Sequence, residues 1–342
     1  MKVAVVFDTP LAGWRHEDHY REMLVDAEEP EPEYEVAEAL LAYEHEVRLI
    51  GVHEDLRSLL DELEGFGPDL VFNCAEGFRD DCRLDYVFAA AIESAGYAYT
   101  GAPPEALLIT RNKAMSKKVL AWHDIQVPGF VTCYPGMPFR APHLAYPLIV
   151  KPVAEDASAG IAHASVVRDE EALESRVAFI HATFSQAAIA EEFIAGRELY
   201  VGALGNADHL EILPVVEMVF DKDKNAPEER IATRHAKWHD GYRERRGIRN
   251  VFARPIAQAA REAIERTCRA AFHALHLRDY ARFDLRLTED QEVWLIEANA
   301  NPFISFGHDM ANAAEKMGLD YYGFIDRIVQ EAMQRRRRGV TA

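Results

Sequence analysis

Long apolar runs are absent from the 342-residue sequence. No stretch approaches the run of about 18 apolar residues that a membrane-spanning helix needs, so we expect no membrane partner. The first residues, MKVAVVFDTP, lack the charged and long apolar regions of a signal peptide and instead predict a strand. Cysteine is scarce and scattered, at Cys74, Cys82, Cys133 and Cys268, with no CxxC motif. This usage predicts free thiols and a cytoplasmic location.

Positive charge is also in short supply. The 57 Asp and Glu residues outnumber the 38 Lys and Arg residues and give a net charge of −19. Such an acidic chain disfavours a nucleic-acid partner. One local exception is the basic run at residues 335–338, which we interpret as the solvated, frayed end of a helix.

Two familiar nucleotide-binding motifs are missing. There is no GxxxxGK[ST], and the first predicted strand is followed by TPLAGWRHEDHY in place of GxGxxG, so neither a P-loop nor a Rossmann dinucleotide site is expected. Separated lysines and a loop of small residues can also hold phosphates. Lys113, Lys151 and the loop ASAG, with Ser158 and Gly160, are candidates, although each alone is more often a surface lysine or a simple turn.

Predicted strands and helices alternate through the first third of the chain. This alternation indicates a small doubly wound α/β domain over residues 1–105. We divide the remainder into a central unit, residues 106–190, and a C-terminal unit, residues 191–342.

Three longer segments have predictions of their own. Residues 9–34 are polar and acidic and predict a mobile loop. Residues 105–125 and 309–336 each predict a helical segment.

Residues 280–303 carry the strongest chemical pattern, two strands joined by the polar turn TEDQE. Alternation along the first strand places Arg282 and Asp284 on one face and Phe283 on the other. On the second strand, alternation groups Leu295 with Glu297 and Asn299, and it groups Trp294 and Ile296 with Ala298.

The hairpin also predicts a metal site. Asp284, Glu297 and Asn299 are hard oxygen donors of the kind that Mg²⁺ prefers. The alternative is an ordinary amphipathic hairpin with a solvated acidic face.

These candidates form an ordered series along the chain. The series is Lys113, Lys151-Pro152, Ser158-x-Gly160, Glu191-Glu192-Phe193-Ile194, Glu198, Lys237, Arg282-x-Asp284 and Glu297-x-Asn299. Together with NCAEG, LIVKP, EEFIAGRE, ARFDLRL and LIEANANP, it resembles the ATP-grasp superfamily, and specifically the D-alanine–D-alanine ligase group, from Phe72 onward. The resemblance implies an α/β protein of ATP-grasp fold, with an N-terminal doubly wound α/β domain followed by two α+β domains that clasp ATP.

The resemblance further implies how ATP and metal would be bound. Lys113 and Lys151 would bind the α- and β-phosphates, the loop of Ser158 and Gly160 would close over the phosphates, and Lys237 would reach the γ-phosphate. Adenosine would be recognised at a hinge, adenine by Glu191, Phe193 and Ile194 and ribose by Glu198. Two Mg²⁺ ions, with Mn²⁺ as an alternative, would be held by Asp284, Glu297 and Asn299.

The implied reaction forms an amide. A carboxylate attacks the γ-phosphate of ATP to give an acyl phosphate and ADP, and an amine then displaces phosphate. The catalytic residues would be Lys237 and Ser158 beside the phosphate and Arg282, which would stabilise the oxyanion. The alternative for Arg282 is a structural ion pair with Asp284 or Glu297. The expected partners are small amino-acid or peptide substrates, and a homodimer is expected from the resemblance alone.

The sequence departs from the ligase pattern around the substrates. No residue after the first strand matches the family's glutamate for the first amino acid. Asp156-Ala157-Ser158 replaces a glycine and two serines, and the extra charge suits phosphates only if Asp156 points outward. The acceptor turn reads PFIS, where Phe303 would crowd the second amino acid and His308 could supply a new contact.

These departures leave alternatives open. A ligase for a non-standard amino acid or a peptide in secondary metabolism is as consistent with the pattern as D-alanyl-D-alanine synthesis, and a catalytically silent ATP-binding protein is a further alternative. The basic insertion around Lys237 predicts a lid or a solvated helix. Its pair His235 and His239 lacks a third zinc ligand.

Overall fold

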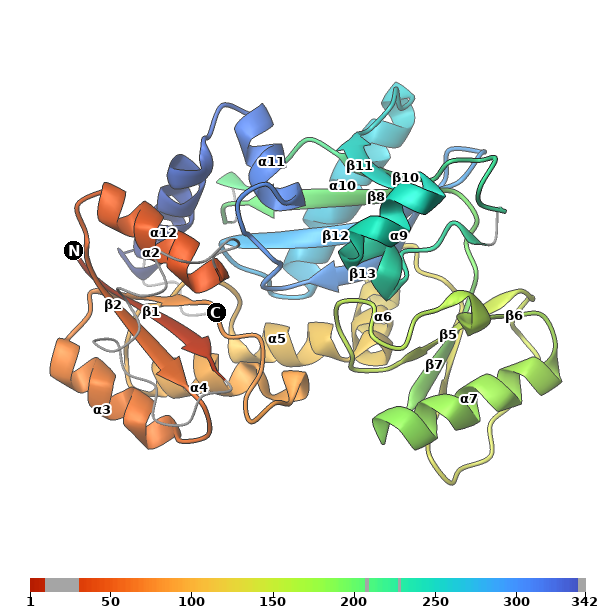
Figure 1. Ribbon diagram of the computed structural model, residues 1–342, viewed down its shortest axis with the longest axis horizontal. Coiled ribbons are helices and arrows are strands. Elements are labelled where there is room, and N and C mark those ends of the chain that lie inside the picture. Colours follow the sequence, from red (N-terminus) through yellow and green to blue (C-terminus); the bar gives the residue numbers. More distant parts are fainter. Residues whose placement is uncertain (10–30, 207–208, 227–228, 338–342) are drawn as a thin grey trace.

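The computed structural model describes residues 1–9, 31–206, 209–226 and 229–337. Its N-terminal part is a parallel sheet in the order β2–β1–β3 (Figure 1). The strands are β1 (Lys2–Asp8), β2 (Glu46–Val52) and β3 (Leu70–Asn73). The segment 97–101 joins the sheet through an isolated bridge between Val71 and Tyr99.

Helices cover both faces of this sheet because β1 is apolar on both sides. Val3 and Val5 pack with helices α2 and α12, whereas Ala4 and Val6 pack with α3 and α4. The helices are α2 (Pro32–Ala42), α3 (Leu56–Phe66), α4 (Tyr86–Ser94) and α12 (Tyr321–Arg337). The doubly wound N-terminal part is therefore confirmed.

The loop predicted for residues 9–34 is wrong at its end, because α2 begins at Pro32. Proline suits the first turn of a helix, where its missing N–H has no intrahelical partner. Residues 10–30 lie outside the described residues.

The helix predicted for residues 105–125 is broken. The structure has α5 (Pro104–Arg111) and α6 (Lys113–Trp122), separated by Asn112 in an extended conformation. The Asn112 side chain accepts a hydrogen bond from the backbone N–H of Met115 and so caps α6. The break sets Arg111 and Lys113 at the junction of two helices.

The central sheet has the order β4–β7–β5–β6 and is covered on one face by α7 (Glu170–Phe184). Its antiparallel strands are β4 (Phe130–Cys133), β5 (Leu148–Pro152), β6 (Val166–Val167) and β7 (Ala188–Glu192). Strand β7 crosses the boundary drawn between residues 190 and 191, and the three-domain division stays a proposal.

The largest sheet has the order β11–β10–β8–β12–β13, with β9 paired to β8. It lies between α10 (Gln258–Ala274) on one face and α11 (Asp309–Lys316) on the other (Figure 1). Its strands are β8 (Arg197–Leu204), β9 (Glu211–Ile212), β10 (Val216–Val219), β11 (Arg249–Phe252), β12 (Tyr280–Leu287) and β13 (Val293–Asn299). The insertion between β10 and β11 contains α8 (Arg234–Trp238) and α9 (Asp240–Arg246).

Strands β12 and β13 form the predicted hairpin, but one assignment of faces is wrong. Asp284 lies opposite Glu297, and the register then shifts so that Leu285 lies opposite Leu295. Leu295 therefore belongs to the apolar core with Leu285, and Trp294 lies opposite Arg286. A local irregularity of this kind breaks the strict two-residue period of a strand.

The C-terminal helical segment also differs from its prediction. Residues 317–320 separate α11 from α12, which continues to Arg337, and Arg335 of the basic run is not solvated as predicted. Arg335 donates hydrogen bonds to Asp279 Oδ2 at 2.9 Å and to the carbonyl oxygen of Tyr99 at 2.8 Å. These contacts tie α12 to the N-terminal part. None of the described helices is long and apolar enough to cross a lipid bilayer.

Candidate active site

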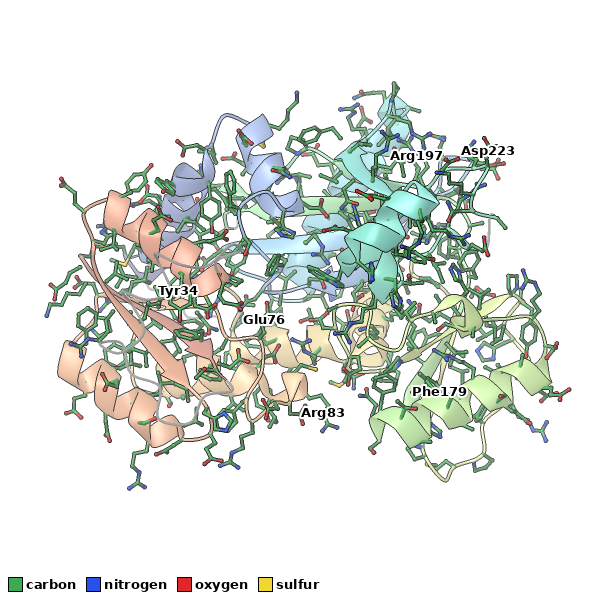
Figure 2. The ribbon with its side chains drawn as sticks, in the orientation of Figure 1. Tyr34, Glu76, Arg83, Phe179, Arg197 and Asp223 are labelled. Carbon is green, nitrogen blue, oxygen red and sulfur yellow. The ribbon has the colours of Figure 1, made fainter. Side chains whose placement is uncertain are left out.

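A cavity of about 1330 Å³ is lined by residues from all three sheets and from the insertion. Asp8 ends β1 and Glu76 follows β3, so the carboxyl edge of the parallel sheet supplies one wall. Figure 2 shows Glu76 near the middle of the molecule. The cavity is therefore the candidate active site.

Most of the predicted phosphate and metal residues line this cavity. They are Lys113, Lys151, Ser158, Lys237, Arg282, Glu297 and Asn299. The others do not line it: Gly160, Glu191, Phe193, Ile194, Glu198 and Asp284. The predicted site residues therefore fall into two groups, those that line the cavity and those that do not.

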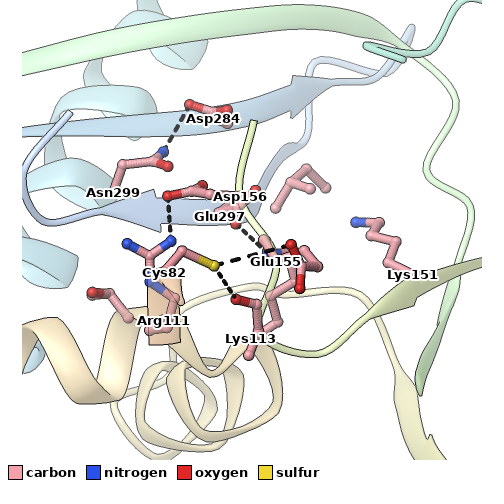
Figure 3. A network of polar contacts seen from close by, with 12 residues as sticks. Cys82, Arg111, Lys113, Lys151, Glu155, Asp156, Asp284, Glu297 and Asn299 are labelled. Atoms are coloured by element: carbon pink, nitrogen blue, oxygen red, sulfur yellow. Dashed lines mark hydrogen bonds and ion pairs between the residues drawn. The ribbon is translucent and has the colours of Figure 1, made fainter. Parts of the chain in front are cut away.

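The three predicted metal donors lie together on facing strands (Figure 3). Asn299 Nδ2 lies 3.2 Å from Asp284 Oδ1, and Glu297 is paired with Asp284 across the hairpin. Two carboxylates and an amide oxygen form a donor set that suits Mg²⁺. The residues present therefore fit the predicted ion.

Cations neutralise these carboxylates in the structure. Arg282 Nε lies 2.7 Å and Lys237 Nζ 3.6 Å from Asp284, and Lys113 Nζ lies 2.7 Å from Glu297 Oε1. Burial would raise the pKa of Asp284, but Arg282 and Lys237 hold it below its ordinary value. Both carboxylates are thus close to groups that carry positive charge at neutral pH.

Glu191, a predicted adenine contact, has a side chain that forms ion pairs with lysines, and its predicted role stays a prediction. Its backbone lies inside the central sheet between β4 and β5, and its buried carboxylate lies 2.8 Å from Lys151 Nζ and 3.5 Å from Lys117 Nζ. Lys117 also donates to the carbonyl oxygen of Ile296 at 2.7 Å. Glu191 therefore holds two lysines beside the cavity.

Lys117 is a site-adjacent residue that sequence reasoning missed. It lies one helical turn after Lys113 on α6, and this spacing was the available signal. Burial lowers its pKa to about 8, although Glu191 opposes the shift, and Lys117 and Lys151 lower the pKa of Glu191 despite burial.

Three other predicted residues have structural contacts. Gly160 has φ +70°, and a Cβ there would lie 2.8 Å from Pro152 Cγ, so both its conformation and its packing require glycine. Glu198 forms an ion pair with Arg286. The backbone N–H of Phe193 donates to Pro147 at 3.0 Å, in the link between β7 and β8 that also contains Ile194.

In the phosphate loop, residues 155–160, Asp156 does not point away from the cavity. Asp156 lines the cavity, and its Oδ2 lies 2.6 Å from Arg111 Nη1 (Figure 3). Trp238 Nε1 donates to the carbonyl oxygen of Ala157 at 3.2 Å, which joins the insertion to the loop. Arg111 and Trp238 were not predicted as site residues.

Aromatic rings form part of the cavity wall. Phe303 and His308 lie 4.7 Å apart between ring centroids, and Trp238 lies 5.8 Å from Phe303. All three residues line the cavity. The altered acceptor turn therefore borders the same space as the phosphate lysines.

Sequence comparison decides the family. The model described as D-ala D-ala ligase C-terminus matches residues 140–330, more than half of the chain. The D-alanine–D-alanine ligase of Bordetella petrii is 30% identical over 278 residues, covering 80% of this chain and 78% of that protein. The chain belongs to the D-alanine–D-alanine ligase family.

Other relatives broaden this comparison. The uncharacterized protein y4sG of Sinorhizobium fredii is 30% identical over 348 residues, covering 98% of each chain. The fold is similar to that of D-alanine–D-alanine ligase from Bacillus anthracis complexed with ATP, with a TM-score of 0.75, 17% identity and 99% of both chains covered. The ATP-grasp fold is thus confirmed, and as a member of this ligase family the chain is an ATP-dependent carbon–nitrogen ligase whose family uses ATP and Mg²⁺.

Proposed function

We propose that the chain joins an amino-acid or peptide carboxylate to an amine through an acyl phosphate, converting ATP to ADP and phosphate. The observation that carries the proposal is the meeting of Lys113, Lys151 and Lys237 with Glu297 and Asn299 around one cavity. Separated cations facing oxygen donors suit a triphosphate with its metal.

The lysines would bind and orient the phosphates of ATP. Lys113 and Lys151 are both nearly buried at the cavity wall, where a charge acts through a lower dielectric than in water. They would hold the α- and β-phosphates, while Lys237 approaches from the insertion. The contact of Trp238 with the phosphate loop would help to exclude water from the reacting centre.

Asp284, Glu297 and Asn299 would hold two Mg²⁺ ions, which is the number that the family resemblance implies. The ion supplies charge neutralisation at the phosphates when it is bound. Arg282 would be released from full pairing with Asp284 and would stabilise the oxyanion; a purely structural ion pair with Asp284 is the competing role.

Adenosine would lie against the link that contains Phe193 and Ile194. Glu191 would act indirectly by fixing Lys151, and Glu198 would reach ribose only by sharing its contact with Arg286. Ser158 would contribute from the phosphate loop, and Gly160 would shape it.

The amine substrate would lie near the aromatic wall. Phe303 belongs to the altered acceptor turn, His308 follows it, and both lie beside Trp238, so Phe303 would crowd a second D-alanine, which favours another acceptor. A cytoplasmic location and a homodimer belong to the same proposal. All four cysteines are free, which suits a reducing compartment.

The test is Mg²⁺-dependent ADP release with a panel of D- and L-amino acids and dipeptides, singly and in pairs, with products identified by mass spectrometry. Amide and ADP formed in equal amounts with any pair would support the proposal. Product from D-alanine alone would assign cell-wall ligase chemistry. ADP release without amide from every pair, in a chain that binds MgATP, would contradict it.

A further inference from the structure

The phosphate loop carries a negative charge inside the cavity. Asp156 lines the cavity, and 49% of its side chain is exposed. A carboxylate beside a triphosphate repels it over several ångströms unless a cation balances the charge. Phosphate binding beside Asp156 therefore requires a nearby cation.

Arg111 supplies that cation, and a second carboxylate fixes it in place. Arg111 Nη1 lies 2.6 Å from Asp156 Oδ2, and its Nη2 lies 2.5 Å from Asp85 Oδ2. Asp85 is buried and directly precedes α4. The three residues come from the N-terminal part, from α5 and from the phosphate loop, so one guanidinium joins three separate segments.

Lys113 contacts the phosphate loop beside Arg111. The break at Asn112 lets Arg111 and Lys113 reach adjacent residues of the loop, since Lys113 Nζ donates to the carbonyl oxygen of Glu155 at 2.5 Å. Desolvation would raise the pKa of Asp156, but Arg111, Lys113 and Arg282 lower it to about 2. These cations therefore favour the charged form of the Asp156 carboxylate.

The backbone of the loop needs such support. Ala157 and Ser158 have φ of 50° and 61°, in the left-handed region that residues with a side chain seldom adopt. Strained conformations persist when surrounding contacts hold them. Arg111 binds Asp156, the residue immediately before Ala157 and Ser158.

We propose that Asp85, Arg111 and Asp156 form a positioning relay. Arg111, held by Asp85, neutralises Asp156 beside the phosphates and ties the phosphate loop to the N-terminal part. The neutralising half rests on the proposed function, because it takes MgATP as the ligand of the cavity. The tie does not depend on any ligand.

The tie is tested by hydrogen exchange on the nucleotide-free protein. R111M, D156N and the double variant should each raise exchange in residues 154–161 and leave α7 unchanged. The matched control removes an exposed pair on α10, Arg269 with Glu265, through R269M and E265Q. Unchanged exchange of residues 154–161 in D156N, a conservative change at a half-exposed site, would overturn the tie.

Neutralisation is tested by calorimetric titration with MgATP. R111M leaves Asp156 unbalanced and should weaken binding about tenfold, whereas D156N should weaken it less and R111K should stay near the unaltered chain. The double variant should recover most of the loss of R111M. Additive effects of R111M and D156N would overturn neutralisation. If the unaltered chain binds no MgATP, the proposed function and neutralisation both fail, while hydrogen exchange still decides the tie.

Discussion

Two carboxylate clusters lie close together in this molecule, and each pairs acids with cations. Glu191 is 1% exposed and is enclosed by Lys117 and Lys151. The side chain of Glu297 is 23% exposed, lines the cavity and shares its hairpin with Asp284. The same residue types therefore give a closed cluster at Glu191 and an open cluster at Glu297.

The two clusters differ in whether a carboxylate can exchange its present ion-pair partner for a ligand. Breaking a closed, buried pair leaves an uncompensated charge away from water. In the open cluster, Glu297 lines the cavity, so a bound ion or a phosphate can reach it and replace Lys113, whereas Asp284 is buried beside it. We propose that access from the cavity, and not composition, separates the structural role of Glu191 from the metal-binding role of Glu297.

The largest expected effect is on turnover at the open cluster. D284N or E297Q should lower Mg²⁺-dependent ADP release by about a thousandfold or more, because each removes a formal charge from the predicted metal ligands. Steady-state ADP release measures this, with D290N in the exposed β12–β13 turn as the control. Turnover within about tenfold of the unaltered chain would remove the metal assignment.

The next effect is on stability at the closed cluster. E191Q should lower the free energy of unfolding by about 3–5 kcal/mol, because two buried lysines lose their counterion. Urea unfolding of E191Q and E297Q compares the two clusters directly. Equal losses would mean that the open cluster is as structural as the closed one.

The smallest effect concerns pH. Burial lowers the pKa of Lys117 from 10.5 to about 8, so between these values the unfolded chain binds more protons than the folded chain. Stability from this group therefore rises with pH from 8 to 10.5, by about 1–3 kcal/mol. K117M should abolish the rise in thermal-melting or urea data, and K118M, on the exposed side of α6, should keep it. A rise that survives in K117M would place its origin elsewhere.

Sequence reasoning reached the open cluster because its residues lie on one hairpin. Asp284, Glu297 and Asn299 follow from strand pairing and short spacings. The face of Leu295 could not be predicted, because a register shift at Asp284 interrupts the alternation. Fold class was accessible in the same way, from alternating strands and helices.

The closed cluster and the relay were out of reach for a different reason. Lys117 meets Glu191 across 74 positions of sequence, and Arg111 meets Asp156 across 45. No local pattern encodes a contact that depends on how sheets and helices pack. The sequence therefore held no sign of the lysines around Glu191, whose predicted adenine contact stays a prediction, and it left open where Asp156 points.

The most direct test of the account is calorimetric titration of the unaltered chain with a non-hydrolysable ATP analogue, with and without Mg²⁺. We expect Mg²⁺ to strengthen binding to the unaltered chain and to leave binding to the D284N and E297Q variants unchanged. Binding of equal strength with and without Mg²⁺ would contradict the central claim that the open cluster serves the nucleotide's metal.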